Sequence, residues 1–507
     1  MSSSRLIDRV RVVVKLLLGT FGGASALFVP MLTGVAAPPQ AAPSTSGSTS
    51  VSPPVTPPRP GGGQPDRPAP SRPATSPTSA TPSGGIAPAP VPISGDSDTG
   101  AWTTGIPAVT SAGSDLAPTT GERATSDASD LTWSIRARLF SRGSVPQIGA
   151  FASGQVVDVA TGQVLWAKNP SVARAPASNQ KVVTAFVALA SMGASTRLTT
   201  AVLQVPAQPA TLYLRGAGDP ALSSKQLAAM ANTVATRVKG QGLAAVTVVV
   251  DDSLFPAPTN AAGWKPEWIP ATVAPVRALV ADQVNVVDTS INAGQVLAAK
   301  LKTVGVTATA VRRGVTPSGA TAVATTLSPT VGQLVQTMLN ASQTDYAEAL
   351  HRLSALRRGF PADWAGARAN AVQVLTAAGI DQAGMVVNDG SGLSRTGRMT
   401  PLTAIDLVRT IRSTPAQNSV IFAAAGMPTS GVSGTLEDRY LTAPTSCARS
   451  AIRAKTGTLA DVVALSGVST GIDGRERLFS VIVNGVSSTS AARADVDALA
   501  ATSTGCY

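Results

Sequence analysis

A serine and a lysine three residues apart, where a loop becomes a helix, constrain this chain more than any other feature. Residues 175–177 have the composition of a loop, and the apolar residues that follow are spaced as on one face of a helix. Ser178 and Lys181 therefore share a face of the first helical turn, at the positive end of the helix dipole. A lysine held partly dehydrated there can be neutral enough to take the hydroxyl proton. This pattern predicts a nucleophilic serine that needs no histidine.

The same spacing also suits a serine that caps the helix and a lysine that is solvated one turn later. A Ser-His-Asp hydrolase would have to use His351, the only histidine, which lies in a stretch with helical periodicity. The Gly-rich box near it in the sequence, 389–394, lacks the Gly-x-Ser-x-Gly pattern of a nucleophile elbow. The scarcity of histidine therefore favours serine–lysine chemistry.

Three further boxes follow in a fixed order and strengthen this interpretation. With the first box they are Pro176–Lys181, Asp389–Ser394, Ser433–Leu436 and Arg453–Thr458. Together they resemble the D-alanyl-D-alanine carboxypeptidase/endopeptidase family of low-molecular-mass penicillin-binding proteins (peptidase family S13). The resemblance runs from about Gly149 to the C-terminus.

The resemblance implies an α/β (α+β) fold of the penicillin-binding/serine β-lactamase type, in which helices flank an antiparallel sheet. Residues 131–195 and 330–507 would form the catalytic domain, with an inserted, mainly β subdomain at 196–329. The insert is shorter than in the larger family members, so one accessory subdomain is expected to be reduced or missing. Periodicity predicts strands at 154–158, 163–167, 211–215, 245–251, 462–467 and 478–483, and helices at 331–340, 346–357, 361–378, 401–413 and 491–501.

The resemblance also implies the chemistry of the site. Ser178 would attack the substrate carbonyl with Lys181 as base, while Lys455 presents a positive charge to the substrate's terminal carboxylate. The backbone N–H groups of Ser178 and Thr458 would form the oxyanion hole. Gly457 is expected to let a ligand approach the backbone closely. The substrate-binding residues implied in this way are Lys455, Thr456, Gly457, Thr458 and Thr344.

The third box of the family, Ser-x-Asn, is altered here. The pair at 347–348 sets the register, so the matching triplet begins at Ser342 and ends at Thr344. The resemblance implies that Ser342 shuttles a proton between the lysine and the leaving group. Thr344 offers a hydroxyl but no amide donor to the substrate carbonyl. Slow turnover on peptides is therefore expected, unless another residue such as Asn340 fills the role.

The N-terminal part of the chain has the composition of an exported protein. Residues 1–37 combine early basic residues with an apolar stretch and are expected to be a signal peptide or a signal anchor in the membrane. Residues 38–130 are rich in Pro, Ser and Thr and predict a disordered linker. Cys447 and Cys506 favour one disulfide outside the cytoplasm, with two free thiols as the alternative.

Composition excludes some other functions. The net charge of +12 suits a surface near anionic polymers or lipids, but no basic run is dense enough to indicate nucleic-acid binding. No spacing of metal ligands is present in the sequence, and no cofactor is implied. We therefore predict an extracytoplasmic serine D-Ala-D-Ala carboxypeptidase or endopeptidase that trims peptidoglycan stem peptides and is acylated by β-lactams. The alternatives are a β-lactamase of the same fold and a catalytically weak cell-wall-binding or scaffold protein.

Overall fold

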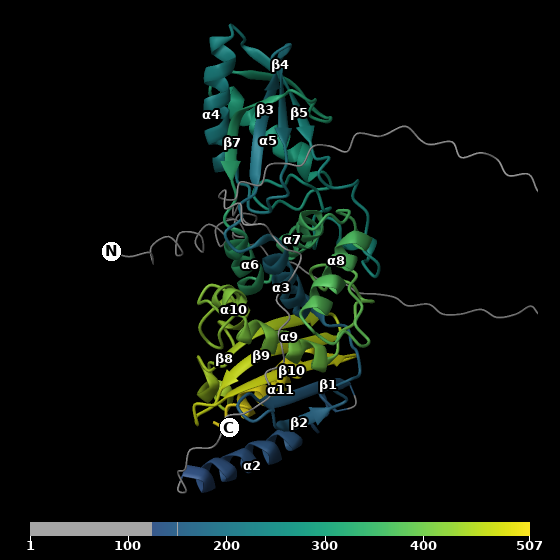
Figure 1. Ribbon diagram of the computed structural model, residues 1–507, viewed down its shortest axis with the longest axis vertical. Helices are drawn as coiled ribbons and strands as arrows, with labels where there is room; N and C mark the ends of the chain where they lie inside the picture. The colour runs from purple at the N-terminus through teal and green to yellow at the C-terminus, as the bar shows by residue number, and fades with distance from the viewer. Residues whose placement is uncertain (1–123, 150, 507) are drawn as a thin grey trace, which may run out of the picture. The chain divides into compact units, whose positions relative to one another are not determined.

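The computed structural model describes residues 124–149 and 151–506, and it arranges their strands in two five-stranded sheets (Figure 1). The predicted segment 1–37 lies outside these residues, as does most of the predicted linker 38–130. The first described helix, α2 (Ala124–Arg142), begins inside that predicted linker. Its C-terminal half buries Ile135 and Leu139, one helical turn apart, in a core shared with the first sheet. In the part of the chain that the structure describes, no helix has both the length and the apolar character needed to cross a bilayer.

The first sheet is antiparallel throughout, in the order β2-β1-β10-β9-β8. The predicted hairpin is present, with Gly162 in the left-handed conformation at its turn. β9 is buried on both faces, which explains why its sequence is a nearly continuous run of small and apolar residues. The strands are β1 (Ala152–Asp158), β2 (Val164–Lys168), β8 (Ile452–Leu459), β9 (Val462–Thr470) and β10 (Glu476–Asn484).

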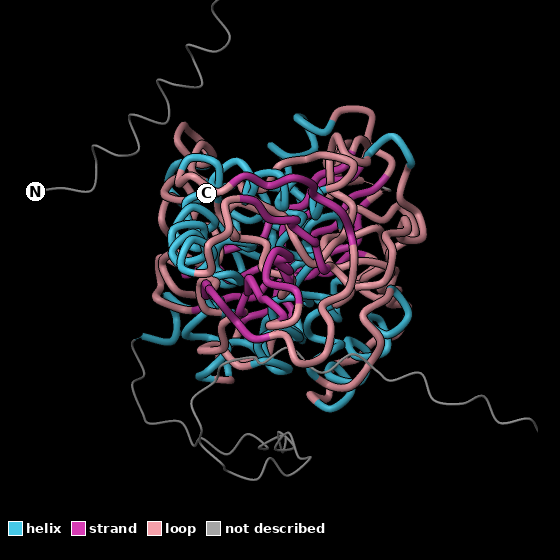
Figure 2. Tube along the Cα trace, turned by 90° about the horizontal axis from the view of Figure 1, so that it is seen from above, coloured by secondary structure: helices cyan, strands magenta, loops and turns pink. Residues whose placement is uncertain are grey.

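Helices cover both faces of this sheet, as predicted (Figure 1). Figure 2 shows the chain from above, with helices in cyan and strands in magenta. On one face α2 and α11 pack against the inward side chains of β1, β9 and β10. On the other face α9 lies directly on the sheet, and α3 packs against the remaining helices. The central helix α3 is apolar and buried along most of its length. The helices are α3 (Gln180–Met192), α6 (Val331–Asn340), α7 (Thr344–Arg357), α8 (Trp364–Ala377), α9 (Pro401–Ser413), α10 (Pro415–Ile421) and α11 (Thr489–Thr502).

The second sheet lies between α3 and α6 in the sequence and has the order β6-β5-β4-β3-β7. The chain enters and leaves it side by side, because Leu198 and Ser328 exchange backbone and side-chain hydrogen bonds. β4, β5 and β6 are parallel, so the chain must cross over between them, and it does so through helices. The elements are β3 (Thr199–Val205), β4 (Gln208–Arg215), α4 (Ser224–Gly240), β5 (Ala245–Asp251), α5 (Thr289–Thr303), β6 (Thr307–Arg313) and β7 (Thr321–Leu327). The insert is thus built on a five-stranded sheet, as predicted, and two helices, α4 and α5, pack against it.

A long connection from β5 to α5 leaves the second sheet and packs on the helices of the first. Phe255 and Trp264 of this connection belong to the same apolar core as α3, α7 and α8. The Trp264 indole N–H also donates a hydrogen bond to Asp389 Oδ2, at 2.7 Å. The insert thus contributes side chains next to the loop 389–394.

Candidate active site

Ser178 lies in a short 3₁₀ turn, η1 (Ala177–Asn179), immediately before α3. The helix itself begins at Gln180, two residues later than the sequence pattern suggested. Lys181 Nζ lies 3.0 Å from Ser178 Oγ, as the serine–lysine interpretation requires. The serine is partly exposed, whereas the lysine is buried. Burial lowers the pKa of Lys181 to about 8, so its neutral form is accessible near neutral pH.

Three acidic side chains surround Lys181, and sequence reasoning gave none of them a part in the site. The negative charges of Glu348, Asp389 and Asp345 oppose the effect of burial on the lysine pKa. Burial also raises the pKa of Glu348 and of Asp389, and the charge of Asp389 raises that of Glu348 further. In the sequence, Glu348 was used only, with Ala347, to align residues 342–344 with the Ser-x-Asn box of the family. Its position between Ala347 and Ala349, on a helix with apolar neighbours on either side, was the available signal.

The loop 389–394, the second of the four boxes, makes direct contact with Lys181 and with the turn that carries Ser178. The backbone O of Ser391 accepts a hydrogen bond from Lys181 Nζ at 3.0 Å. Gly392 has a φ of +78°, and a Cβ there would lie only 1.8 Å from the backbone O of Ala177. Only glycine lets this loop lie so close to residues 176–179. These residues form the turn that carries the predicted nucleophile Ser178, and we call it the nucleophile turn.

The Lys-Thr-Gly box lies on β8, the edge strand of the first sheet. Ala454 N–H donates to Pro428 O on the side of β8 that does not pair with β9. Backbone groups alternate sides along a strand, so the N–H groups of Thr456 and Thr458 point to the same open edge. The Thr456 hydroxyl is 2.7 Å from that of Thr435, which belongs to the Ser433–Leu436 box.

Gly457 has a packing reason for being glycine, in addition to the predicted approach of a ligand. A Cβ at this position would lie 2.8 Å from Pro176 O and 2.9 Å from Asn179 Nδ2. Both atoms belong to the nucleophile turn. The missing side chain therefore allows η1 to lie against β8.

Lys455 is completely buried, and its Nζ lies 3.0 Å from the backbone O of Thr456. Burial, together with the positive charges of Lys181 and Arg439, lowers the pKa of Lys455 well below its usual value. The two lysines are therefore close enough in the site for their charges to repel. A bound anion there would favour the charged form of Lys455.

Ser342 and Thr344 lie at the junction of α6 and α7, two helices that both pack against α3. Ser342 has a φ of +57°, and Thr344 is the first residue of α7. Both side chains are partly exposed, and neither forms a hydrogen bond within the described residues. Asn340, by contrast, forms a hydrogen bond, in which its side-chain amide donates to Gly426 O at 3.3 Å. One of its two amide N–H groups therefore has a structural partner.

Among the residues that the structure describes, no serine forms a hydrogen bond with His351. It is buried on α7, and burial, followed by the charges of Arg352 and Arg368, lowers its pKa to about 3.

A stretch not considered in the sequence analysis, 467–471, does fit Gly-x-Ser-x-Gly. Its Ser469 is buried inside strand β9, however, with its hydroxyl 2.7 Å from that of Ser503. It does not stand on the exposed strand-to-helix turn of a nucleophile elbow. Within residues 124–149 and 151–506, no group of three or more His, Cys, Asp or Glu side chains is placed to hold a metal.

The two cysteines form the expected disulfide, with a Cα–Cα distance of 5.9 Å between Cys447 and Cys506. Cys447 lies in a short 3₁₀ turn shortly before β8, and Cys506 follows α11. The bond therefore ties the C-terminal tail to the segment that leads into the lysine strand.

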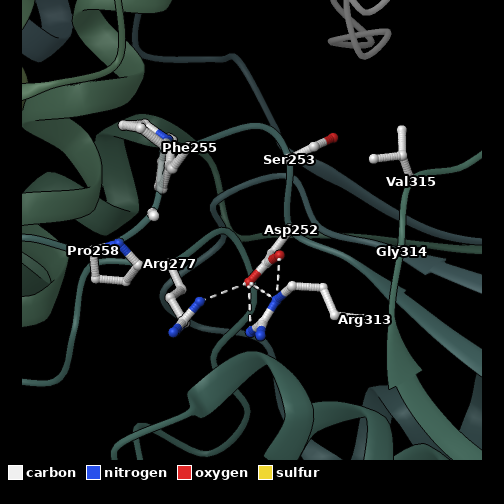
Figure 3. A pocket seen from close by; sticks show the side chains of 10 residues that line it. Asp252, Ser253, Phe255, Pro258, Arg277, Arg313, Gly314 and Val315 are labelled. Carbon is white, nitrogen blue, oxygen red and sulfur yellow. Dashed lines mark hydrogen bonds and ion pairs between the residues drawn. The ribbon is translucent and has the colours of Figure 1, made fainter.

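A cavity of about 370 Å³ lies in the insert, and none of its lining residues belongs to the predicted catalytic set. Figure 3 shows Asp252 between Arg277 and Arg313, with Phe255 and Pro258 nearby. Asp252 accepts hydrogen bonds from both arginines, at 3.1 Å from Arg277 and 3.0 Å from Arg313. Asp288 pairs with Arg313 as well, so the positive charges are already balanced. The network links the ends of β5 and β6 to the connection that leads into α5.

The whole described region has known relatives. The sequence model of the D-Ala-D-Ala carboxypeptidase 3 (S13) family matches residues 136–287 and 280–505. Carboxypeptidase DacB from Mycolicibacterium smegmatis is 33% identical over 385 residues, which cover 71% of this chain and 82% of that protein. Carboxypeptidase Rv3627c from Mycobacterium tuberculosis is 33% identical over 362 residues, covering 67% of this chain and 77% of that protein.

Among solved structures, penicillin binding protein 4 (dacB) from Haemophilus influenzae is similar, with a TM-score of 0.62. The match covers 72% of this chain and 97% of that one, at 21% identity. This likeness confirms the predicted fold.

Proposed function

The chain belongs to the D-Ala-D-Ala carboxypeptidase 3 (S13) family, and we propose that it hydrolyses the terminal D-Ala-D-Ala bond of peptidoglycan stem peptides through an acyl-enzyme on Ser178. The observation that carries this proposal is the 3.0 Å contact between Lys181 Nζ and Ser178 Oγ. The lowered pKa of Lys181 supports its part as the base. Endopeptidase cleavage of D-amino-acid cross-links uses the same steps.

In the proposed reaction, neutral Lys181 takes the hydroxyl proton while Ser178 Oγ attacks the carbonyl carbon of the penultimate D-alanine. The backbone N–H groups of Ser178 and Thr458 stabilise the oxyanion that forms. The peptide C–N bond then breaks, and Ser342 relays the proton from Lys181 to the departing amine. Water hydrolyses the resulting ester and frees Ser178. A β-lactam would acylate the same oxygen.

Substrate binding is assigned to the edge of β8. Lys455 would bind the terminal carboxylate of the substrate, and the Thr456 and Thr458 backbone would align the peptide along the strand. The open edge and the exposure of Thr458 support this assignment. Thr344 would face the substrate carbonyl without supplying an amide donor.

A cell-wall substrate places the reaction outside the cytoplasm. We propose that residues 1–37 export the chain and, if uncleaved, hold it to the membrane. Residues 38–130 would then act as a flexible linker, apart from the beginning of α2. The catalytic domain would comprise 131–195 and 330–507, and 196–329 would be an inserted subdomain.

Labelling with a fluorescent penicillin tests the proposal. The parent protein is expected to become labelled on Ser178, as shown by peptide mapping, and Ser178→Ala is expected to lose the label while its thermal unfolding is unchanged. Label that persists in Ser178→Ala would remove this serine from the mechanism. Rapid release of the label would instead favour a β-lactamase, and an unlabelled parent would favour a scaffold.

A further inference from the structure

Glu348 holds two consecutive peptide units beside Lys181, and the proposed mechanism gives it no part. The N–H groups of Gly390 and Ser391 donate to Glu348 Oε2 and Oε1, each at 2.9 Å. On the opposite side, Thr184 Oγ1 donates to the backbone O of Gly390 at 2.6 Å. Thr184 follows Lys181 by one turn on α3. The loop is thus fastened both to α7 and to the helix that carries the catalytic lysine.

The next peptide unit is fastened in the same way, and it contacts the lysine directly. Gly392 N–H donates to Asp389 Oδ1 at 2.9 Å. The carbonyl of that same peptide unit, Ser391 O, accepts the hydrogen bond from Lys181 Nζ at 3.0 Å. Every peptide unit from Gly390 to Gly392 therefore has its N–H bound to a buried carboxylate. The position of the Ser391 carbonyl is set by groups other than the lysine.

A carbonyl oxygen can only accept, so it must receive one of the N–H groups of Lys181. A neutral amine has two N–H groups and one lone pair in a tetrahedral arrangement. With one N–H directed to Ser391 O, the lone pair can point to Ser178 Oγ, which is also 3.0 Å from Nζ. If the carbonyl moved, the amine could rotate and lose this direction.

We propose that Glu348 is a positioning residue for Lys181, and that it acts through the backbone of the loop 389–392 by keeping the Ser391 carbonyl in place. The proposal rests on the proposed function, because it concerns the base of that reaction. Glu348 touches no substrate in this role. Glu348 transfers no proton, and it acts by orienting the lone pair of Lys181 toward Ser178 Oγ.

A purely electrostatic role would behave differently. The charged groups that face Lys181 are Glu348 and Asp345 from α7, Asp389 from the loop and Lys455 from β8. Each carboxylate raises the lysine pKa, so removing one charge should lower that pKa and move the acid limb of the acylation profile to lower pH. Charge loss alone leaves the rate at the alkaline plateau unchanged. Loss of positioning lowers the plateau itself.

Three variants of the full chain separate these roles when acylation by fluorescent penicillin is measured from pH 6 to 10. Glu348→Gln is expected to shift the acid limb to lower pH and to lower the plateau about 10- to 100-fold, as for a misplaced catalytic group. Asp345→Asn is the matched control. It removes a neighbouring charge but keeps the oxygen that accepts the Ala274 N–H. The acid limb is therefore expected to move to lower pH, while the rate at the plateau is unchanged. Thr184→Val changes no charge and is expected to lower the plateau about two- to tenfold with the limb in place.

Thermal unfolding of each variant accompanies the rates. A Glu348→Gln plateau equal to that of the parent overturns the proposal, and so does an equal loss in Asp345→Asn. If Glu348→Gln does not fold, the test rests on Thr184→Val. An acylation rate of Thr184→Val at the alkaline plateau equal to that of the parent then overturns the proposal. A parent that is never acylated refutes the proposed function and this role with it. An acylated parent with unchanged variants refutes the positioning role alone.

Discussion

Alanine in place of Gly457 should displace the nucleophile turn, because the space for its Cβ is already taken. The new atom would lie 2.8 Å from Pro176 O and 3.1 Å from Ala177 Cβ. An ordinary contact begins near 3.4 Å, so the closest atom is about 0.6 Å too near. That atom is backbone and belongs to the turn that carries Ser178. It cannot rotate away, so the turn itself must shift by several tenths of an ångström.

Such overpacking costs about 1–3 kcal/mol of stability. Displacement of a reacting group by up to about 1 Å costs roughly 100-fold in rate, so a 10- to 100-fold loss of acylation is expected for Gly457→Ala. The assay is the second-order rate of labelling by fluorescent penicillin, with the thermal unfolding midpoint measured on the same samples. Gly240→Ala at the end of α4 is the control, since nothing lies within 4 Å of its Cβ position. A Gly457→Ala rate equal to the parent's would refute the argument that this glycine sets the position of the nucleophile.

Three other outcomes are expected. Lys455→Gln should slow acylation by substrates with a free C-terminal carboxylate about ten- to hundredfold more than by amidated analogues, from the loss of one charge-assisted hydrogen bond; equal losses would make the lysine structural. Thr344→Asn should speed acylation by peptide about two- to tenfold, since one neutral donor is restored. No gain there, together with a loss in Asn340→Ala, would assign the donor to Asn340. Joint replacement of Cys447 and Cys506 by alanine should lower the unfolding free energy in urea by about 4 kcal/mol, given the 59-residue separation; an unchanged midpoint would show that the bond adds no stability.

Local patterns in the sequence were sufficient for much of the fold and for the central pair of the site. The spacing of Ser178 and Lys181 predicted their contact because residues one helical turn apart lie together wherever the helix is placed. The helices at 331–340 and 401–413 were predicted with their observed bounds, since their apolar residues repeat with the helical period. Periodicity was less informative in the insert, where α4 and α5 cover one face of a mixed parallel and antiparallel sheet.

What the sequence determined by itself, then, was the family, the order of the boxes and the pairing of residues that are near neighbours in the chain. Only the tertiary structure decided which distant groups meet them. Glu348 and Lys181 are far apart in the sequence, and they act on one another through a loop that is more distant still. The reason for Gly457 likewise appears only where β8 lies against the nucleophile turn. Periodicity and motifs report local geometry, whereas burial, pKa and close approach depend on atoms that only packing of the whole chain brings together.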